Sequence, residues 1–242
     1  MSFHVIIPAR MASTRLPQKP LHSIAGYPMI VHTAKRCLMS DAASVTVCTD
    51  HHRIHWVCRD HGLQTVDTHS NHVCGTDRCN EAADKLGLAD DDIIVVVLGD
   101  EPFVRPEWIN TVGRMMETTD HPTIYPYQYC NDIGNVARIK FAVSNGRVLF
   151  MSRYDIPMDF RKDRALKKCV NVIGFRRNTL RVFAQLGEGE VEHYEGIEMM
   201  RLLEANIDIG TCHLSGPETF TVDVPADLER ANQLMPDYDV KW

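Results

Sequence analysis

Six consecutive apolar residues at 93–98, Ile-Ile-Val-Val-Val-Leu, restrict the possible folds of this chain more than any other segment. Continuous apolar runs of this length are typical of strands that are covered on both faces, as in parallel sheets. Further strand patterns alternate with helical patterns along the chain before this run. The strand patterns lie at 3–9, 44–49 and 63–67, and the helical patterns lie at 28–40, 51–61 and 75–86. This alternation predicts a mixed α/β protein with a mostly parallel sheet and helices on both faces.

The second half of the chain has a less regular pattern. Strand patterns follow one another with little helix between them, so we expect these strands to pair antiparallel. They lie near 122–129, 137–143, 147–151 and 169–176, with helices at 178–186 and about 191–205, a strand near 207–213 and a last helix from Pro225. The sequence contains no repeat, low-complexity segment or linker. It therefore predicts one domain over 1–242, with a β-rich insertion at approximately 121–215.

Composition excludes several classes of protein. No apolar run approaches the ~18 residues of a membrane span, and the first residues lack the features of a signal peptide. The 26 Lys and Arg against 32 Asp and Glu give a formal net charge of −6, which argues against a nucleic-acid partner. The eight cysteines form no Cys-x-x-Cys motif and fit reduced thiols. We expect a soluble cytoplasmic protein without membrane insertion.

A basic loop at 8–20 follows the first predicted strand. It carries three cations and two hydroxyls, namely Arg10, Arg15, Lys19, Ser13 and Thr14. Ligands of α/β sheets bind beyond the carboxyl ends of the strands, and Arg and Lys suit phosphate groups. The loop matches neither the Walker nor the dinucleotide-binding pattern, and a solvated loop is the alternative. We favour a phosphate site of another kind.

Two acids are candidate ligands for Mg²⁺. Asp100 follows the apolar run, and Asp223 precedes the helix expected from Pro225. Mg²⁺ usually takes one or two protein carboxylates together with phosphate oxygens and water. The alternatives are a turn-forming Asp100 and a helix-capping Asp223. Sequence spacing does not show whether the two acids meet.

Six of the twelve histidines lie between His51 and His72. His51 and His55 share one face of the predicted helix at 51–61, a spacing that could chelate zinc. No His-Glu-x-x-His motif accompanies them. We favour a solvated, pH-sensitive face over a metal site, and the role of this cluster stays open.

Several motifs resemble, in order and over nearly the full length, those of the CMP-3-deoxy-manno-octulosonate (CMP-Kdo) synthetases. They are Pro8-Ala9-Arg10-x-x-Ser13-Thr14-Arg15-Leu16-Pro17-x-Lys19-Pro20-Leu21, Gly26-x-Pro28-Met29-Ile30, Thr49-Asp50, Gly75-Thr76-Asp77-Arg78, Gly99-Asp100-Glu101-Pro102, Ser152-Arg153-x-x-Ile156-Pro157 and Val222-Asp223-x-Pro225-x-Asp227-Leu228. The first and last motifs together are specific, and the others are weaker individually. The resemblance implies a nucleotidyltransferase sheet of Rossmann-like type.

The resemblance also implies a reaction. CTP and a 3-deoxy-2-ulosonic acid, Kdo or an analogue, would give the CMP-sugar and pyrophosphate for a lipopolysaccharide or capsule. The catalytic residues would be Arg10, Lys19 and Asp100, and Asp100 and Asp223 would carry Mg²⁺. CTP would be bound by Pro8, Ala9, Arg10, Ser13, Thr14, Arg15, Lys19, Thr76 and Arg78. The acceptor sugar would be bound by Arg153, Cys169, Ile173, Glu198, Met199 and Arg201. Family members are commonly dimers, so we expect a homodimer with the β-rich insertion as interface and sugar-binding region.

The chain departs from the family pattern at several positions. Gln18 stands where most members have Gly, which puts the backbone shape of the loop in question. Leu98 replaces a Gln. In the sugar pocket, Cys169, Ile173 and Met199 replace a His, a Tyr and a Gln. Either the alignment slips by a residue or two in this half, or the acceptor is a modified acid such as 8-amino-Kdo or a nonulosonic acid.

Two further hypotheses stay open. The chain could be a non-catalytic relative that binds a nucleotide or sugar, because polar contacts are lost. It could also be a nucleotidyltransferase that acts on a sugar phosphate or alditol phosphate, which needs a second cationic site. Candidates for that site are Arg161, Lys162, Arg164, Lys167 and Lys168, although we favour a solvated mobile loop as the explanation for this cluster.

Overall fold

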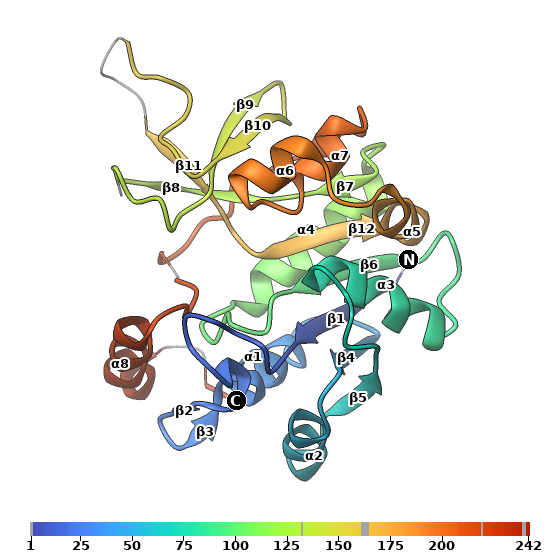
Figure 1. Cartoon of the computed structure of the whole chain (residues 1–242), viewed down its shortest axis with the longest axis vertical. Coiled ribbons are helices and arrows are strands. Elements are labelled where there is room, and N and C mark those ends of the chain that lie inside the picture. The colour runs from blue at the N-terminus through green and yellow to red at the C-terminus, as the bar shows by residue number, and fades with distance from the viewer. Residues whose placement is uncertain (1, 132, 161–164, 219, 239–240) are drawn as a thin grey trace.

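The computed structural model describes residues 2–131, 133–160, 165–218, 220–238 and 241–242. Within them, eleven strands form one sheet in the order β5-β4-β1-β6-β12-β7-β13-β10-β9-β11-β8 (Figure 1). The first four of these strands in the sheet order are parallel to one another. Their bounds are Gln64–Asp67 (β5), Ser44–Thr49 (β4), Phe3–Ala9 (β1) and Ile93–Val97 (β6). The predicted mixed α/β class and the parallel half of the sheet are confirmed.

Helices cover both faces of the parallel half because side chains alternate along each strand. Val5 and Ile7 of β1 point into a core shared with the helices Met29–Cys37 (α1), His52–Asp60 (α2) and Pro106–Thr118 (α4). Ile6 points into a second core shared with Gly75–Lys85 (α3), Arg177–Leu186 (α5) and Met200–Glu204 (α7). All three of these β1 residues are fully buried, as expected for a strand with continuous apolar character.

The remaining strands extend the same sheet beyond β6. They are Val172–Arg176 (β12), Thr123–Ile124 (β7), Ile209–Gly210 (β13), Arg147–Ser152 (β10), Lys140–Ser144 (β9), Leu166–Cys169 (β11) and Tyr127–Cys130 (β8). Most of these pairs are antiparallel, and only β13 and β7 run parallel. The segment at 121–215 thus supplies both β12, which lies directly beside β6, and the more distant strands β8 to β11.

Several predicted elements differ from the observed ones. The predicted strand at 122–129 is two strands, β7 and β8, because Pro126 separates them and they pair with different neighbours. The strand at 169–176 likewise divides at Asn171 into β11 and β12. The helix at 191–205 divides into Glu190–Glu195 (α6) and α7, because Gly196 takes a positive φ of 62° that ends α6. The helix α4 is not among the predicted elements, although Pro106 at its first turn is a start signal.

The C-terminal segment packs against the N-terminal one. A third buried cluster contains Leu16, Ile24, Met29, Phe103, Phe220, Val222, Ala231 and Met235. It includes residues of α1, of the two-stranded hairpin Ser23–Ile24 (β2) and Tyr27–Pro28 (β3), and of the helix Pro225–Leu234 (α8). Short 3₁₀ turns at Lys19–Leu21 and Met235–Asp237 complete this region. Chain segments from opposite ends of the sequence therefore lie side by side (Figure 1).

Among the helices formed by the described residues, none combines the length and the apolar character that a membrane crossing requires.

Candidate active site

Lys19 brings the two candidate carboxylates together. Its Nζ lies 2.5 Å from Asp100 Oδ2 and 2.8 Å from Asp223 Oδ1. Burial by itself would lower the pKa of Lys19, but the charges of Asp100 and Asp223 and their hydrogen bonds outweigh burial and raise it. Lys19 is therefore a charged ammonium between two acids that lie far apart in the sequence.

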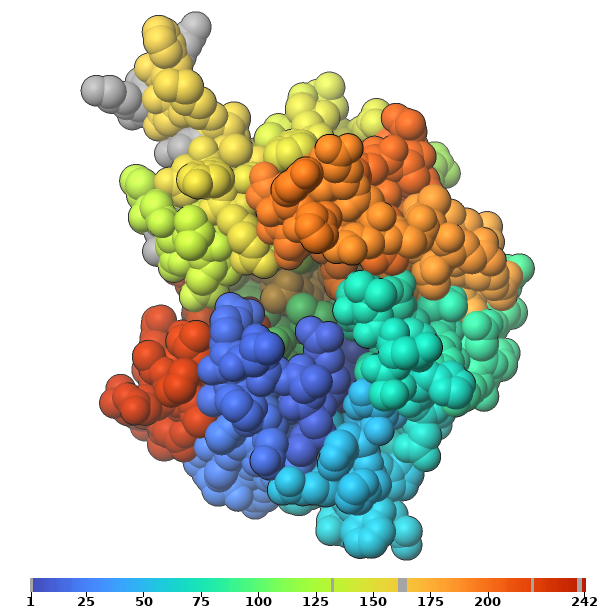
Figure 2. Space-filling model, viewed as in Figure 1, coloured from blue at the N-terminus to red at the C-terminus, as the bar shows by residue number. Residues whose placement is uncertain are grey.

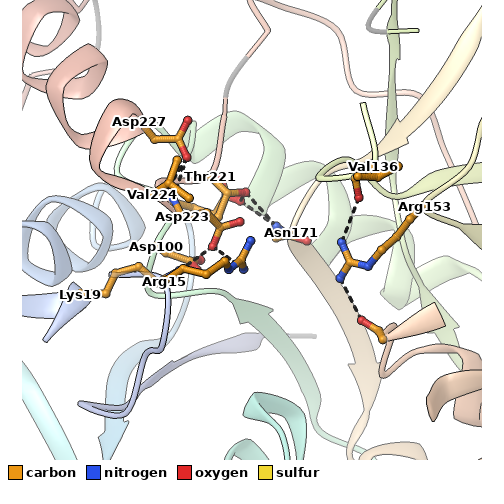
Figure 3. A network of polar contacts seen from close by, with 12 residues as sticks. Arg15, Lys19, Asp100, Val136, Arg153, Asn171, Thr221, Asp223, Val224 and Asp227 are labelled. Carbon is orange, nitrogen blue, oxygen red and sulfur yellow. Dashed lines mark hydrogen bonds and ion pairs between the residues drawn. The ribbon is translucent and has the colours of Figure 1, made fainter. Parts of the chain in front are cut away.

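The backbone places Asp223 beside Asp100. Val222 is fully buried and its N–H donates to the carbonyl of Asp100 at 3.1 Å. On the other side, Asp227 Oδ2 accepts the N–H groups of Asp223 and Val224 at 2.9 and 3.1 Å, which caps the start of α8. Capping is therefore done by Asp227, and the side chain of Asp223 points toward Lys19 (Figure 3).

Close packing behind Asp100 requires the glycine that precedes it. A Cβ at Gly99 would lie 2.8 Å from the carbonyl oxygen of Pro8 and 3.2 Å from Ile30 Cδ1. The end of β6 can approach the end of β1 this closely only without a side chain at position 99. Pro8 and Ala9 are both buried at this end of β1, so the basic loop begins directly beside Asp100.

The donor set at Asp100 and Asp223 fits a divalent cation. Both are carboxylates, which Mg²⁺ prefers, and the Oδ1 of Asp100 is buried without a hydrogen-bond partner among the described residues. A buried carboxylate oxygen left unpaired is costly unless a ligand completes it. In the part of the chain that the structure describes, no three His, Cys, Asp or Glu side chains are grouped as a metal site. A cation here would therefore need oxygens from a substrate or from water.

The basic loop presents its charged side chains at the surface. Arg10 and Arg15 are exposed, and Arg15 Nη2 lies 3.0 Å from Asp223 Oδ1. Thr14 is exposed and Ser13 is half-buried. The loop thus offers two exposed guanidinium groups and two hydroxyls on the side of the acid pair.

Gln18 keeps the loop backbone in a conformation that suits glycine. Its φ of 59° and ψ of 28° lie in the left-handed region, which L-residues rarely adopt. Arg53 of α2 donates from Nη1 to Gln18 Oε1 at 3.0 Å and holds the side chain. The substitution for Gly therefore leaves the left-handed turn in place, at a cost in backbone strain.

The first turn of α3 forms another side of the candidate site. Thr76 is buried and donates from Oγ1 to Glu198 Oε1 at 2.8 Å, which joins a predicted nucleotide contact to a predicted sugar contact. Arg78 is 2% exposed and donates to Thr68 Oγ1, the carbonyl of His69 and Asp50 Oδ2. The guanidinium of Arg78 is thus used to hold the preceding loop.

Arg153 faces the acid pair from the other side of the site (Figure 3). Its guanidinium donates to three backbone carbonyls, those of Glu195 at 2.9 Å, Gly196 at 3.0 Å and Val136 at 3.3 Å. Among the described residues no carboxylate forms an ion pair with it, because the carboxylate of Glu195 binds Ser152 and the backbone N–H of Arg153 instead. The charge of Arg153 is therefore held in position but not neutralised.

The other predicted sugar contacts lie deeper. Ile173 and Met199 are each 1% exposed and belong to the second core. Arg201 is 3% exposed and binds Glu192, Asp77 and the carbonyl of Phe183. The side chains of Ile173, Met199 and Arg201 therefore pack inside the protein. Cys169 and Glu198 are half-buried, and burial raises the pKa of the Cys169 thiol to about 11.

Three polar residues of this region were not predicted as site residues, namely Glu101, which entered only as part of the Gly99–Pro102 motif, Asn171 and Thr221. Glu101 is 5% exposed; burial, followed by the charge of Asp100, raises its pKa to about 7. Asn171 and Thr221 both hydrogen-bond to it. A signal for Asn171 was present in the sequence, because a polar residue interrupts the apolar pattern at 169–176.

The histidine cluster is spread over separate contacts. His51 accepts the N–H of Arg53 at the start of α2, and His55 lies 3.4 Å from Asp67. His72 binds Glu81 instead, near α3. Of the predicted basic cluster, residues 161–164 lie outside the described residues. Lys168 is buried against Glu218, and Lys167 lies over the Tyr127 ring.

The surface is hollowed between the N-terminal segment, blue in Figure 2, and the segments coloured yellow and orange above it. Figure 3 shows Lys19, Asp100 and Asp223 on one side of the site and Arg153 on the other, with Asn171 between them in this view. A basic loop at the carboxyl end of a parallel strand, facing two acids, is the kind of site that handles the polyphosphate of a nucleotide. The fold and the site thus define the class of nucleotidyltransferases.

Comparisons with known proteins specify the family. A model of the cytidylyltransferase family matches residues 4–209. The chain is 37% identical to the 3-deoxy-manno-octulosonate cytidylyltransferase of Cellvibrio japonicus, over 97% of this chain and 98% of that one. It is 35% identical to the enzyme of the same name from an Acidovorax species, over 96% and 97% of the two chains. The chain belongs to the cytidylyltransferase family, and within it to the 3-deoxy-manno-octulosonate cytidylyltransferases.

One solved structure agrees with this assignment, and a second shares the fold. A CMP:2-keto-3-deoxy-manno-octonic acid synthetase complexed with CTP is 32% identical, with a TM-score of 0.90 over 98% of this chain and 99% of the other. The inositol-1-phosphate CTP transferase of T. maritima shares the fold at a TM-score of 0.71 and 14% identity, covering 100% of this chain and 98% of that one.

Proposed function

We propose that this protein transfers CMP from CTP to 3-deoxy-manno-octulosonate and releases pyrophosphate, in the synthesis of a lipopolysaccharide or capsule. The observation that carries the proposal is the meeting of Lys19, Asp100 and Asp223 beside the basic loop, opposite an Arg153 whose charge is not neutralised. The names of the similar proteins support the substrates.

The basic loop would bind the phosphates. Arg10, Arg15 and Lys19 would neutralise the triphosphate and stabilise the departing pyrophosphate, since charge develops there during the transfer. Ser13 and Thr14 would donate hydrogen bonds to phosphate oxygens. The backbone of Pro8, Ala9 and Arg10, together with Thr76 and Arg78, would lie near cytosine and ribose, where the buried Arg78 shapes the loop wall.

Asp100 and Asp223 would hold Mg²⁺, which supplies Lewis-acid stabilisation of phosphate charge when it is bound. The buried, unpartnered Oδ1 of Asp100 supports this assignment. Without a cation, Lys19 keeps the two carboxylates together. With CTP present, the ammonium of Lys19 is free to bind phosphate oxygens.

Arg153 would bind the carboxylate of the sugar acid. Its three carbonyl partners fix the guanidinium without using its charge, so a carboxylate that arrives gains a charge-assisted hydrogen bond. We expect Arg153→Met to raise the KM for the sugar acid and to leave the KM for CTP unchanged. An equal rise in both KM values would contradict this role.

The test of the function is pyrophosphate release from CTP and Mg²⁺ with Kdo, 8-amino-Kdo, a nonulosonic acid or no acceptor. We expect turnover with Kdo, and Asp100→Asn as the control should reduce it by orders of magnitude. Turnover of another acid alone would keep the chemistry but replace the acceptor. Tight CTP binding without pyrophosphate release in any reaction would refute the proposal and favour a non-catalytic relative.

We also propose a homodimer formed through the segment at 121–215, in the cytoplasm. Large apolar side chains are exposed there, including Met158 at 84%, Leu149 at 59% and Tyr129 at 50%. Large apolar side chains that are exposed on one segment make that segment a candidate for a protein interface. Sedimentation equilibrium tests this, and a monomer at micromolar concentration would refute it.

A further inference from the structure

A closed set of hydrogen bonds among Glu101, Asn171 and Thr221 lies next to the two aspartates and joins three distant chain segments. Figure 3 labels two of its members, Asn171 and Thr221. Asn171 Nδ2 donates to Glu101 Oε1 at 2.7 Å and to Thr221 Oγ1 at 3.3 Å. Thr221 Oγ1 in turn donates to the same Glu101 oxygen at 2.5 Å. Each of the three side chains thus binds both of the others.

Two members of this set are attached directly to the aspartate segments. Glu101 follows Asp100 in the chain, and Thr221 lies two residues before Asp223. The N–H of Val222, which lies between Thr221 and Asp223, donates to the carbonyl of Asp100. A shift of Thr221 relative to Glu101 would therefore change the spacing of the two aspartates.

Asn171 comes from the opposite side, between β11 and β12. Its carbonyl accepts the N–H of Leu98 at 3.3 Å, and its Oδ1 accepts the hydroxyl of Tyr125 at 2.9 Å. The backbone and Oδ1 fix Asn171 to the sheet, so its Nδ2 is presented to Glu101 and Thr221 from a rigid support. Asn171 thereby attaches the C-terminal segment, which carries Thr221, to the sheet.

We infer that Asn171 is a positioning residue that acts through Glu101 and Thr221 to fix the separation of the Asp100 and Asp223 carboxylates. The inference rests on the proposed function, in which these two acids hold Mg²⁺. Lys19 holds the two carboxylates together only while its ammonium lies between them. When a cation takes that place, a second set of contacts must keep the carboxylates at the same separation. Glu101 is buried, and leaving its carboxylate short of donors is costly, which makes the set rigid.

The test compares Mn²⁺ affinity by electron paramagnetic resonance in Asn171→Ala, Thr221→Val and Thr221→Ser. Residues that orient metal ligands typically change metal affinity about 10- to 100-fold when they are replaced, and we expect this range for Asn171→Ala and Thr221→Val. Thr221→Ser keeps the hydroxyl and should retain the wild-type affinity. Tyr125→Phe is a graded control, because it removes one bond to Oδ1 but keeps the backbone bond of Asn171 and both Nδ2 bonds, so its loss of Mn²⁺ affinity should be smaller than that of Asn171→Ala.

Kinetics supply a second readout. The KM for Mg²⁺ should rise in Asn171→Ala and Thr221→Val, whereas metal-free CTP binding by calorimetry should stay at the wild-type value. A purely structural defect would weaken both kinds of binding, and would overturn the inference. So would wild-type Mn²⁺ affinity in Asn171→Ala, or equal losses in Thr221→Ser and Thr221→Val.

Asp100→Asn distinguishes a failure of the positioning role from a failure of the metal site. If Asp100→Asn loses Mn²⁺ and the Asn171 and Thr221 variants do not, only the positioning role is wrong. If Asp100→Asn binds Mn²⁺ as well as the wild type, the metal site of the proposed function is wrong, and the positioning role is refuted with it.

Discussion

Replacing Lys19 by Met should separate metal binding from catalysis. Lys19 Nζ lies 2.5 Å from Asp100 Oδ2 and 2.8 Å from Asp223 Oδ1, so these two oxygens are at most about 5 Å apart. Without the ammonium, two negative charges at that separation repel by about 3 kcal/mol at an effective dielectric constant of about 20. A divalent cation would relieve this repulsion. We therefore expect Lys19→Met to bind Mn²⁺ more tightly than the wild type in the absence of CTP.

Catalysis should respond in the opposite direction. Lys19→Met removes a cation proposed to bind the phosphates, so pyrophosphate release should fall by orders of magnitude despite tighter metal binding. Arg15→Met is the matched control, because Arg15 also contacts Asp223 but its side chain is 56% exposed and its interaction is screened. Its effect on metal affinity should be smaller. Metal affinity in Lys19→Met that is equal to or below the wild-type value would refute the reasoning.

Substitutions at Gln18, Gly99 and Glu81, two of them with a matched control, test the backbone of the site and the acid stability of the fold. Gln18→Val places a β-branched residue at a φ of 59° and should lower the free energy of unfolding by about 1–2 kcal/mol, whereas Gln18→Gly should not; equal urea midpoints for the two would contradict the strain. Gly99→Ala should abolish activity and lower stability, because its Cβ would lie 2.8 Å from a backbone oxygen of Pro8 that cannot move aside. Gly75→Ala is the control, because its Cβ would meet only a side-chain carbon of Pro8 at 3.2 Å, and it should lower the melting temperature less. Burial works to raise the pKa of Glu81, but hydrogen bonds from Lys85, His72 and the backbone of His69 outweigh it and lower the pKa to about 2. Glu81 therefore stabilises the fold above its unfolded pKa and loses this contribution as pH falls toward 2, so the wild type should lose more stability than Glu81→Gln between about pH 4.5 and 2; an identical acid response would argue against it.

The parallel half of the sheet could be predicted because local pattern and long-range packing agree there. Apolar continuity at β6 and the helical pattern at α3 each follow from burial on one or both faces. The antiparallel half was predicted less well. Its strands β7 and β13 have only two residues each, and they are strands only because they pair with neighbours in the sheet. Patterns in so short a segment carry little information about which strand lies beside it.

The site shows the same division between local and long-range information. The basic loop and Asp100 could be found because each follows a strand that the pattern identifies. That Asp223 lies beside Asp100 depends on the third buried cluster and on the bond from Val222 to the Asp100 carbonyl. Such contacts join opposite ends of the chain, and no local pattern encodes them. The role of Asn171 and Thr221 was missed for this reason: the polar interruption at Asn171 is visible in the sequence, but the partners that it meets are not.

The four apolar departures from the family pattern are connected in the structure. Ile173 and Met199 are buried members of the second core, and Leu98 and Cys169 are partly buried residues that pack against the same core. The family pattern that the sequence resembles has polar residues at these four positions. Ile173 and Met199 would have to leave the core to contact a sugar, whereas Cys169 lies at the edge of the core beside a polar group, because its thiol donates to Asn171 Oδ1 at 3.7 Å. We therefore expect recognition of the acceptor to rest mainly on groups outside this core, and Arg153, with its charge fixed but not neutralised, is the group best placed for it.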